Sequence, residues 1–129
     1  MKGLVADLET VAPKAVVFNY TNPVNIVAQA VSQFTDTPIV SLCEGPIFYP
    51  AQIAEAAGLD PARLDVASVG LNHASWSVRH RWDGQDLLPL LRDAWERRGD
   101  DTTVKPATRR AWELAVRFGS VPSEYMQYY

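Results

Sequence analysis

The sequence predicts an α/β fold in which a parallel βαβ unit is followed by a second part of α+β character, with a hairpin and amphipathic helices. Two short apolar segments, 15–18 and 38–42, flank a stretch with helical spacing, and this strand, helix, strand order is typical of parallel sheets. A later segment, 76–82, alternates apolar and polar residues and ends at an Asp-Gly pair, which indicates a hairpin.

Four elements are expected in the first part of the chain. Apolar residues at helical spacing predict a helix over residues 1–11, which Pro13 ends. The segment 15–18 reads as a short, fully buried strand, residues 24–34 offer an apolar helical face, and 38–42 reads as a second buried strand. Together they predict one βαβ unit, which is half of a nucleotide-binding type of domain.

Helices and strands also alternate in the second part. The expected elements are a helix over 51–58, a turn opened by Asp60–Pro61, a third buried strand over 66–69, the alternating strand over 76–82, and amphipathic helices over 87–97 and 107–118. Gly58 is expected to stop the first of these helices, and Asp83–Gly84 to form the hairpin turn.

Length, composition and charge restrict the class of protein to which this chain can belong. With 129 residues, 47% of them hydrophobic, the chain can bury one modest core. A net charge of −3 with dispersed Lys and Arg gives no footprint for a nucleic acid, and no apolar run approaches the roughly 20 residues that span a membrane. One cysteine and a start without a signal-type apolar run predict a cytoplasmic protein.

Three polar segments, Asn19–Asn25, Leu42–Pro46 and Gly70–Trp76, each follow a predicted buried strand. Because open α/β sheets carry their chemistry at strand ends, we expect their Asn, Cys and His side chains to face one crevice. Cys43 is the only cysteine and His73 is one of two histidines. A thiolate and an imidazole together suit a first-row divalent cation, so a metal site is the first hypothesis.

Four motifs follow one another along nearly the whole chain. They are Asn-Pro within Thr21–Pro23, Leu-Cys-x-x-Pro at Leu42–Pro46, Gly-Leu-Asn-His at Gly70–His73 and Pro-x-x-Tyr-x-x-Tyr at Pro122–Tyr128. In this order they resemble glycoside hydrolase family 4, whose fold is related to that of lactate and malate dehydrogenases. The combination is more specific than any single motif, since Thr-Asn-Pro-Val-Asn also occurs in those dehydrogenases.

The resemblance implies a fold and a reaction. Residues 1–43 would be the last βαβ unit of an NAD-binding, Rossmann-like domain, and residues 44–129 the beginning of the sugar-binding catalytic domain. The implied enzyme is a cytoplasmic glycosidase that uses NAD and a divalent metal, commonly Mn²⁺, in place of two carboxylates. In the family, NAD transiently oxidises the sugar at C3, a tyrosine removes the C2 proton, and the aglycone leaves by elimination. The implied substrate is a phosphorylated sugar glycoside, a 6-phospho-glucoside first, or a galactoside, and the full-length protein is expected to be a homo-oligomer, a dimer or a tetramer.

The resemblance also assigns roles to individual residues. They are Cys43 and His73 as metal ligands, Asn22 as a contact to sugar and cofactor, Asn72 as a group that orients substrate hydroxyls or the metal shell, and Tyr125 or else Tyr128 as the base.

Glu44 occupies the position after the cysteine, where the residue type varies with substrate specificity in the family. Some members that cleave α-linked phosphosugars have an Asp there, proposed as the acid, and β-specific members tend to have Asn. Glu44 retains the carboxyl group, so it is either a general acid or a charge that stabilises the start of the following helix.

Each assignment has a purely structural alternative. Cys43 would then be an inert core thiol and His73 a partner of a backbone carbonyl, while the tyrosines would pack in a core or an interface. His80, in the alternating strand, is interpreted as a surface residue of the hairpin.

Two other functions stay open. None of the seven glycines forms the Gly-x-Gly fingerprint of a dinucleotide site, so we expect the middle of a longer family member that does not turn over substrate by itself. A non-catalytic relic or interaction fragment is one alternative, and an NAD-dependent 2-hydroxy-acid dehydrogenase is the other. The pair of Cys43 and His73 counts against the dehydrogenase.

Overall fold

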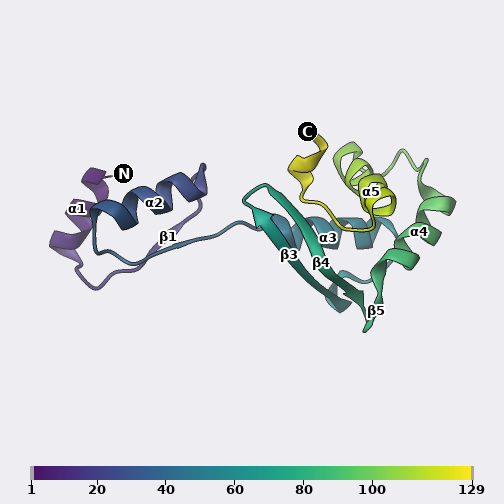
Figure 1. Cartoon of the computed structure of the whole chain (residues 1–129), viewed down its shortest axis with the longest axis horizontal. Coiled ribbons are helices and arrows are strands. Elements are labelled where there is room, and N and C mark those ends of the chain that lie inside the picture. The colour runs from purple at the N-terminus through teal and green to yellow at the C-terminus, as the bar shows by residue number, and fades with distance from the viewer. Residues whose placement is uncertain (1, 129) are drawn as a thin grey trace. The chain divides into compact units, whose positions relative to one another are not determined.

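The computed structural model describes residues 2–128, which divide between two compact units, Met1–Cys43 and Glu44–Tyr129 (Figure 1). The fold is mixed α/β, with one parallel and one antiparallel sheet, which confirms the predicted class. Among the described residues, no helix has the length and apolar character needed to cross a membrane.

The first unit is the expected βαβ arrangement preceded by a helix. Its elements are α1 (Lys2–Val11), β1 (Val17–Asn19), α2 (Val24–Phe34) and β2 (Ile39–Ser41). The two strands pair in parallel, with Val17 opposite Ile39 and Asn19 opposite Ser41. Parallel pairing follows from the crossover through α2.

The strands of this unit are not fully buried as predicted. Phe18 and Val40 face each other across the pair and are 66% and 43% exposed, whereas Asn19, one position further along β1, is 4% exposed. Successive residues of a strand point to opposite faces. The face of Asn19 meets α2, since the Asn19 side chain bonds to the Val24 carbonyl at the start of that helix.

The second unit combines helices with a three-stranded antiparallel sheet. Its elements are α3 (Gly45–Ala56), the 3₁₀ turn η1 (Pro61–Arg63), β3 (Leu64–Leu71), β4 (Ala74–Trp82), β5 (Gln85–Asp86), α4 (Leu87–Arg98), α5 (Pro106–Phe118) and the 3₁₀ turn η2 (Glu124–Tyr128). The strand order is β3-β4-β5. The turn between β4 and β5 confirms the predicted hairpin at Asp83–Gly84, where both residues have positive φ, 50° and 78°.

The third strand differs from the prediction in length, burial and sheet. β3 is longer than 66–69, and its Val69 and Leu71 are 58% and 74% exposed. It pairs with β4 and not with the parallel sheet, because a two-residue turn returns the chain at once, and a parallel partner needs a crossover of a dozen or more residues. The expectation that all three polar segments follow buried strands of one open sheet is therefore wrong for the segment that contains His73.

Helix α3 begins at Gly45, earlier than the predicted start at Ala51. Pro46 lies in its first turn, where the missing N–H has no helical partner to lose. Pro50 lies inside the helix, which sequence rules disfavour. The turn that follows Pro50 is packed in the core, where Ile53 and Ala54 are 1% and 0% exposed.

The core of the second unit forms where α3, α4 and α5 meet. It consists of Ile53, Leu87, Leu91, Ala94, Ala111, Trp112, Ala115 and Val121. The indole N–H of the fully buried Trp112 donates to the Leu91 carbonyl at 3.0 Å, which satisfies its only donor. Because Val121 belongs to this core, the chain that leads to the tyrosine cluster is anchored there.

Candidate functional site

Asn22 lies in the exposed loop between β1 and α2, and the buried side chain of Asn19 holds that loop. The Asn19 amide nitrogen donates to Ser41 Oγ at 3.1 Å and to the Val24 carbonyl at 3.4 Å. Its Oδ1 accepts from the Thr21 N–H at 2.9 Å. Sequence reasoning missed this role, although an Asn at the end of an apolar strand is a signal, since a buried amide must be bonded.

Cys43 follows β2 as a half-buried free thiol. The next residue, Glu44, is exposed and occupies the N-cap position of α3. Its backbone carbonyl accepts from the N–H groups of Ile47 and Phe48, at 3.0 and 2.8 Å, but its side chain makes no capping hydrogen bond. The Glu44 carboxylate is therefore accessible to a ligand.

Asn72 and His73 are the two residues of the β3–β4 turn, since Leu71 pairs with Ala74. Both are half-buried. His73 has a φ of 66°, in the left-handed region that non-glycine residues seldom adopt. Among the described residues no hydrogen bond occupies its ring nitrogens, so the imidazole is available to a ligand.

The structure brings His73 and Tyr125 together. Their rings stack, with centroids 3.8 Å apart and an interplanar angle of 17°. Tyr128 lies behind Tyr125 at a centroid distance of 6.3 Å and is 74% exposed. Of the two tyrosines that the sequence offered as a base, Tyr125 is the one in contact with His73.

Tyr125 reaches this position because the preceding segment lies along β4. The N–H of Ser77 donates to the Val121 carbonyl and the N–H of Ser123 to the Ser75 carbonyl, both at 2.8 Å. The hydroxyl of Ser123 donates to the carbonyl of His73 at 2.7 Å. This segment acts as a further edge strand, a contact that the sequence did not reveal.

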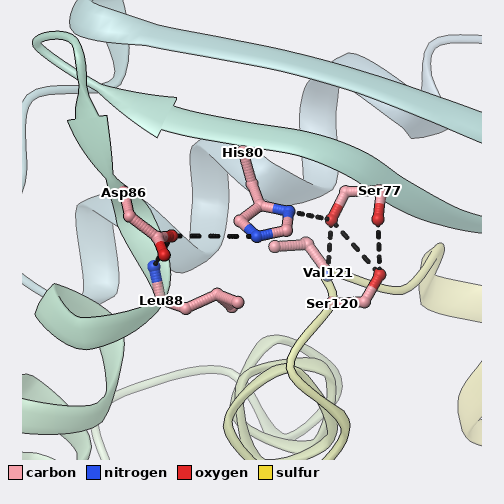
Figure 2. A network of polar contacts seen from close by, with 6 residues as sticks. All are labelled: Ser77, His80, Asp86, Leu88, Ser120 and Val121. Atoms are coloured by element: carbon pink, nitrogen blue, oxygen red, sulfur yellow. Dashed lines mark hydrogen bonds and ion pairs between the residues drawn. The ribbon is translucent and has the colours of Figure 1, made fainter.

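His80 belongs to a polar network and is not a surface residue as expected, since its side chain is only 17% exposed (Figure 2). Its Nδ1 lies 3.0 Å from Ser77 Oγ, and its Nε2 lies 3.7 Å from Asp86 Oδ1. Asp86 in turn accepts from the Leu88 N–H and caps α4. The strand alternation did not reveal this because the network also needs residues from 120 onward.

This network contains Asp86, His80 and Ser77, the residue types of a hydrolytic triad, but its role is to stabilise the fold and not to catalyse a reaction. Ser77 is 5% exposed, and its Oγ already accepts from the Val121 N–H at 2.7 Å. The Ser120 hydroxyl closes the network by donating to the Ser77 carbonyl at 2.7 Å. A nucleophilic serine needs access to its substrate, which Ser77 lacks.

Residues 2–128 hold no group of three or more His, Cys, Asp or Glu side chains placed to bind a metal ion. Cys43 belongs to the first unit and His73 to the second. Cys43 offers a thiol, and His73 offers an imidazole whose ring nitrogens make no hydrogen bond to a described residue, so the donor chemistry of each fits a divalent cation.

One carboxylate has a strongly shifted pKa, and it lies outside these segments. The hydroxyl and backbone N–H of Thr103, with help from Arg98, lower the pKa of Asp101 from 3.8 to about 2. Asp101 lies in the loop between α4 and α5, so it stabilises that loop and has no place among the predicted site residues.

Comparison with protein families gives two matches. Residues 2–59 match the model described as family 4 glycosyl hydrolase, and residues 68–129 match the family 4 glycosyl hydrolase C-terminal domain. A maltose-6'-phosphate glucosidase of Fusobacterium mortiferum is 30% identical over 98% of this chain and 32% of its own length. The chain thus spans about a third of the curated relatives that it matches.

Solved structures show the same fold. A 6-phospho-alpha-glucosidase from gut microorganisms in complex with NAD and Mn²⁺ superposes on 96% of this chain and 31% of its own, with a TM-score of 0.77 at 23% identity. Another, in complex with NAD and glucose-6-phosphate, covers 99% of this chain and 31% of its own, with a TM-score of 0.69 at 25% identity.

Proposed function

The chain belongs to family 4 of the glycosyl hydrolases, and we propose that it acts in the hydrolysis of the O-glycosyl bond of a 6-phospho-glucoside. The observation that carries the proposal is the contact between His73 and Tyr125, which joins the proposed cation ligand to the proposed base. A relative named maltose-6'-phosphate glucosidase and a structural relative bound to glucose-6-phosphate support this substrate class. Their activity also favours a glycosidase over a 2-hydroxy-acid dehydrogenase.

Each of the two units has a separate proposed role. Residues 1–43 are the last βαβ unit of a Rossmann-like NAD domain, and residues 44–129 begin the domain that binds the sugar. The parallel pairing of β1 and β2 supports the first part. The match of residues 68–129 to the C-terminal domain of the family supports the second.

The proposed cofactors are NAD and a divalent cation, with Mn²⁺ the first choice, since structural relatives contain both. When bound, NAD accepts and returns a hydride at C3 of the sugar, and the cation polarises the neighbouring hydroxyls as a Lewis acid. Cys43 and His73 are the residues that would hold the cation, the first as a thiolate and the second as a neutral imidazole. Asn22 contacts sugar and cofactor, and Asn72, beside His73, orients substrate hydroxyls.

Tyr125 is proposed to take the C2 proton onto its phenolic oxygen. Its ring stacks on His73, so a sugar that reaches the cation also reaches this phenol. Tyr128 is the second choice, because it contacts Tyr125 and is more exposed. Glu44 is proposed to give a proton to the leaving oxygen, which its exposed carboxyl group allows.

We further propose a cytoplasmic location and a homo-oligomer, a dimer or a tetramer, with neither membrane nor nucleic acid as a partner. The single cysteine and the net charge of −3 support the first and last of these. Exposed apolar side chains such as Phe18 and Leu71 support self-association.

Thermal unfolding with and without Mn²⁺ tests the proposal. A cation at about 100 times its Kd should add about 2.7 kcal/mol to the free energy of unfolding. The Cys43→Ser and His73→Ala variants should lose this gain, and His80→Gln, which changes the other histidine, should keep it. Addition of glucose 6-phosphate with Mn²⁺, but not of glucose, should raise the melting temperature further. No response to Mn²⁺ in the unmodified chain, or an equal response in all variants, would contradict the proposed site.

A further inference from the structure

The contact between His73 and Tyr125 depends on one buried residue that contacts both of their segments. Ser123 is 5% exposed and lies two residues before Tyr125. Its hydroxyl donates to the His73 carbonyl at 2.7 Å, and the Ser123 Oγ itself accepts from the Ser75 N–H at 3.5 Å. The hydroxyl therefore holds the turn on its His73 side and on its β4 side.

The backbone of Ser123 serves the tyrosine. Its N–H donates to the Ser75 carbonyl at 2.8 Å, which fixes the segment against β4. Its carbonyl accepts from the Met126 N–H at 3.1 Å, which closes the 3₁₀ turn that carries Tyr125. Ser123 thus bonds to the turn that carries His73 and to the 3₁₀ turn that carries Tyr125.

His73 needs such support because its backbone is in an uncommon conformation. With φ at 66°, it occupies the left-handed region, which costs a non-glycine residue free energy and persists only where neighbouring contacts offset that cost. The hydrogen bond from Ser123 to the His73 carbonyl is such a contact, and it comes from 50 residues further along the chain.

We propose that Ser123 is a positioning residue, which sets the distance between the imidazole of His73 and the phenol of Tyr125. This inference rests on the proposed roles of those two residues for its functional meaning. Its geometric content is independent of them: without the Ser123 hydroxyl, the His73 ring no longer stacks on Tyr125. Because groups that orient a metal ligand affect affinity, Mn²⁺ binding should weaken about tenfold or more.

Proton NMR of the 129-residue chain tests the geometry without metal or substrate. The imidazole C–H signals of His73 should be shifted upfield by the Tyr125 ring, and His80→Gln identifies them because the chain has two histidines. Ser123→Ala should abolish that shift, and Ser123→Thr, which retains the hydroxyl, should preserve it. The indole N–H signal of the buried Trp112 shows that each variant is folded.

Ser120→Ala is the matched control. Ser120 belongs to the same segment as Ser123, and its hydroxyl also donates a hydrogen bond of 2.7 Å to a backbone carbonyl. The acceptor, however, is Ser77 within β4 and not a residue of the turn. We expect this variant to keep the ring-current shift and the Mn²⁺ affinity. The proposal is overturned if Ser123→Ala retains the shift, or if Ser120→Ala and Ser123→Ala lose it equally.

Titration with Mn²⁺ separates this inference from the proposed function. If the folded Ser123→Ala chain loses the stacking signal and the unmodified chain does not respond to Mn²⁺, Ser123 positions the rings and the metal proposal fails. If the unmodified chain binds Mn²⁺ and Ser123→Ala binds it equally well with the stack intact, the metal proposal holds and the role of Ser123 is disproved.

Discussion

The imidazole of His73 and the phenol of Tyr125 stack at a centroid distance of 3.8 Å, although two β-strands and two α-helices separate them along the chain. His73 is in a hairpin turn, and Tyr125 is in a 3₁₀ turn that follows an edge segment bonded to β4. The contact distinguishes Tyr125 from its neighbour Tyr128, which has no contact with His73 among those described.

The two tyrosines should therefore differ in catalysis. Tyr125→Phe retains the stacked ring and removes only the ionisable oxygen, so we expect kcat to fall by about 10² to 10⁴-fold, the range of a lost general base. Tyr128→Phe should change kcat by less than about threefold, since an exposed side chain contributes little to the transition state. Steady-state hydrolysis of a 6-phospho-glucoside by the full-length protein, with NAD and Mn²⁺, measures both. Equal losses in the two variants would rule out a special role for Tyr125.

Asn19 should stabilise the first unit. Asn19→Ala leaves the Thr21 N–H and the Ser41 hydroxyl without their partner, at a cost of about 1–3 kcal/mol. The control is Asn25→Ala, which changes an exposed asparagine of α2. Its free energy of unfolding should stay within about 0.5 kcal/mol of that of the unmodified chain. Urea unfolding followed by far-UV circular dichroism gives both values, and similar values for the two variants would show that the Asn19 bonds are dispensable.

Ser77 should be important to the second unit as a structural residue. Ser77→Ala leaves the buried Val121 N–H without an acceptor, and we expect a loss of about 1–3 kcal/mol. Ser32→Ala, on the exposed face of α2, should have little effect. Tryptophan fluorescence during urea unfolding reports this unit, because all four tryptophans lie within it. An unchanged midpoint for Ser77→Ala would show that another acceptor or water replaces the hydroxyl.

Asp101 should make the stability of the protein fall in acid. Its pKa is about 2 when folded, against an ordinary 3.8, because Thr103 bonds its charged form. A lowered folded pKa gives stability that is complete above about pH 4 and is lost as the pH falls toward 2. Asp101→Asn should therefore lose less stability between pH 5 and 2 than the unmodified chain, and the exposed neighbour Asp100→Asn should behave like the unmodified chain. Melting temperatures across this range measure the difference, and parallel curves for all three proteins would refute it.

Local sequence rules predicted the parts of the fold that depend on local chemistry. The βαβ order, the Asp83–Gly84 turn and the helices α4 and α5 follow from apolar spacing and turn residues, which act within a few positions. The rules failed for α3, because Pro50 is tolerated only where the surrounding helix is packed. They also failed for β3, since its sheet partner follows from the short turn at Asn72–His73 and not from its own apolar residues.

The amino-acid sequence specifies which residue types are available for chemistry: one cysteine, two histidines and a group of tyrosines after Pro122, in the order of the family motifs. It did not determine which of these side chains meet. Three features depend on segments about 40 or more residues apart: the stacking of His73 on Tyr125, the hydrogen bond from Ser123 to the turn, and the burial of His80 beside the segment that begins at Ser120. Such contacts arise only when burial of the core around Trp112 and Val121 brings the chain beside β4, because side-chain hydrogen bonds and ring contacts act over a few ångströms and have no signature in local sequence.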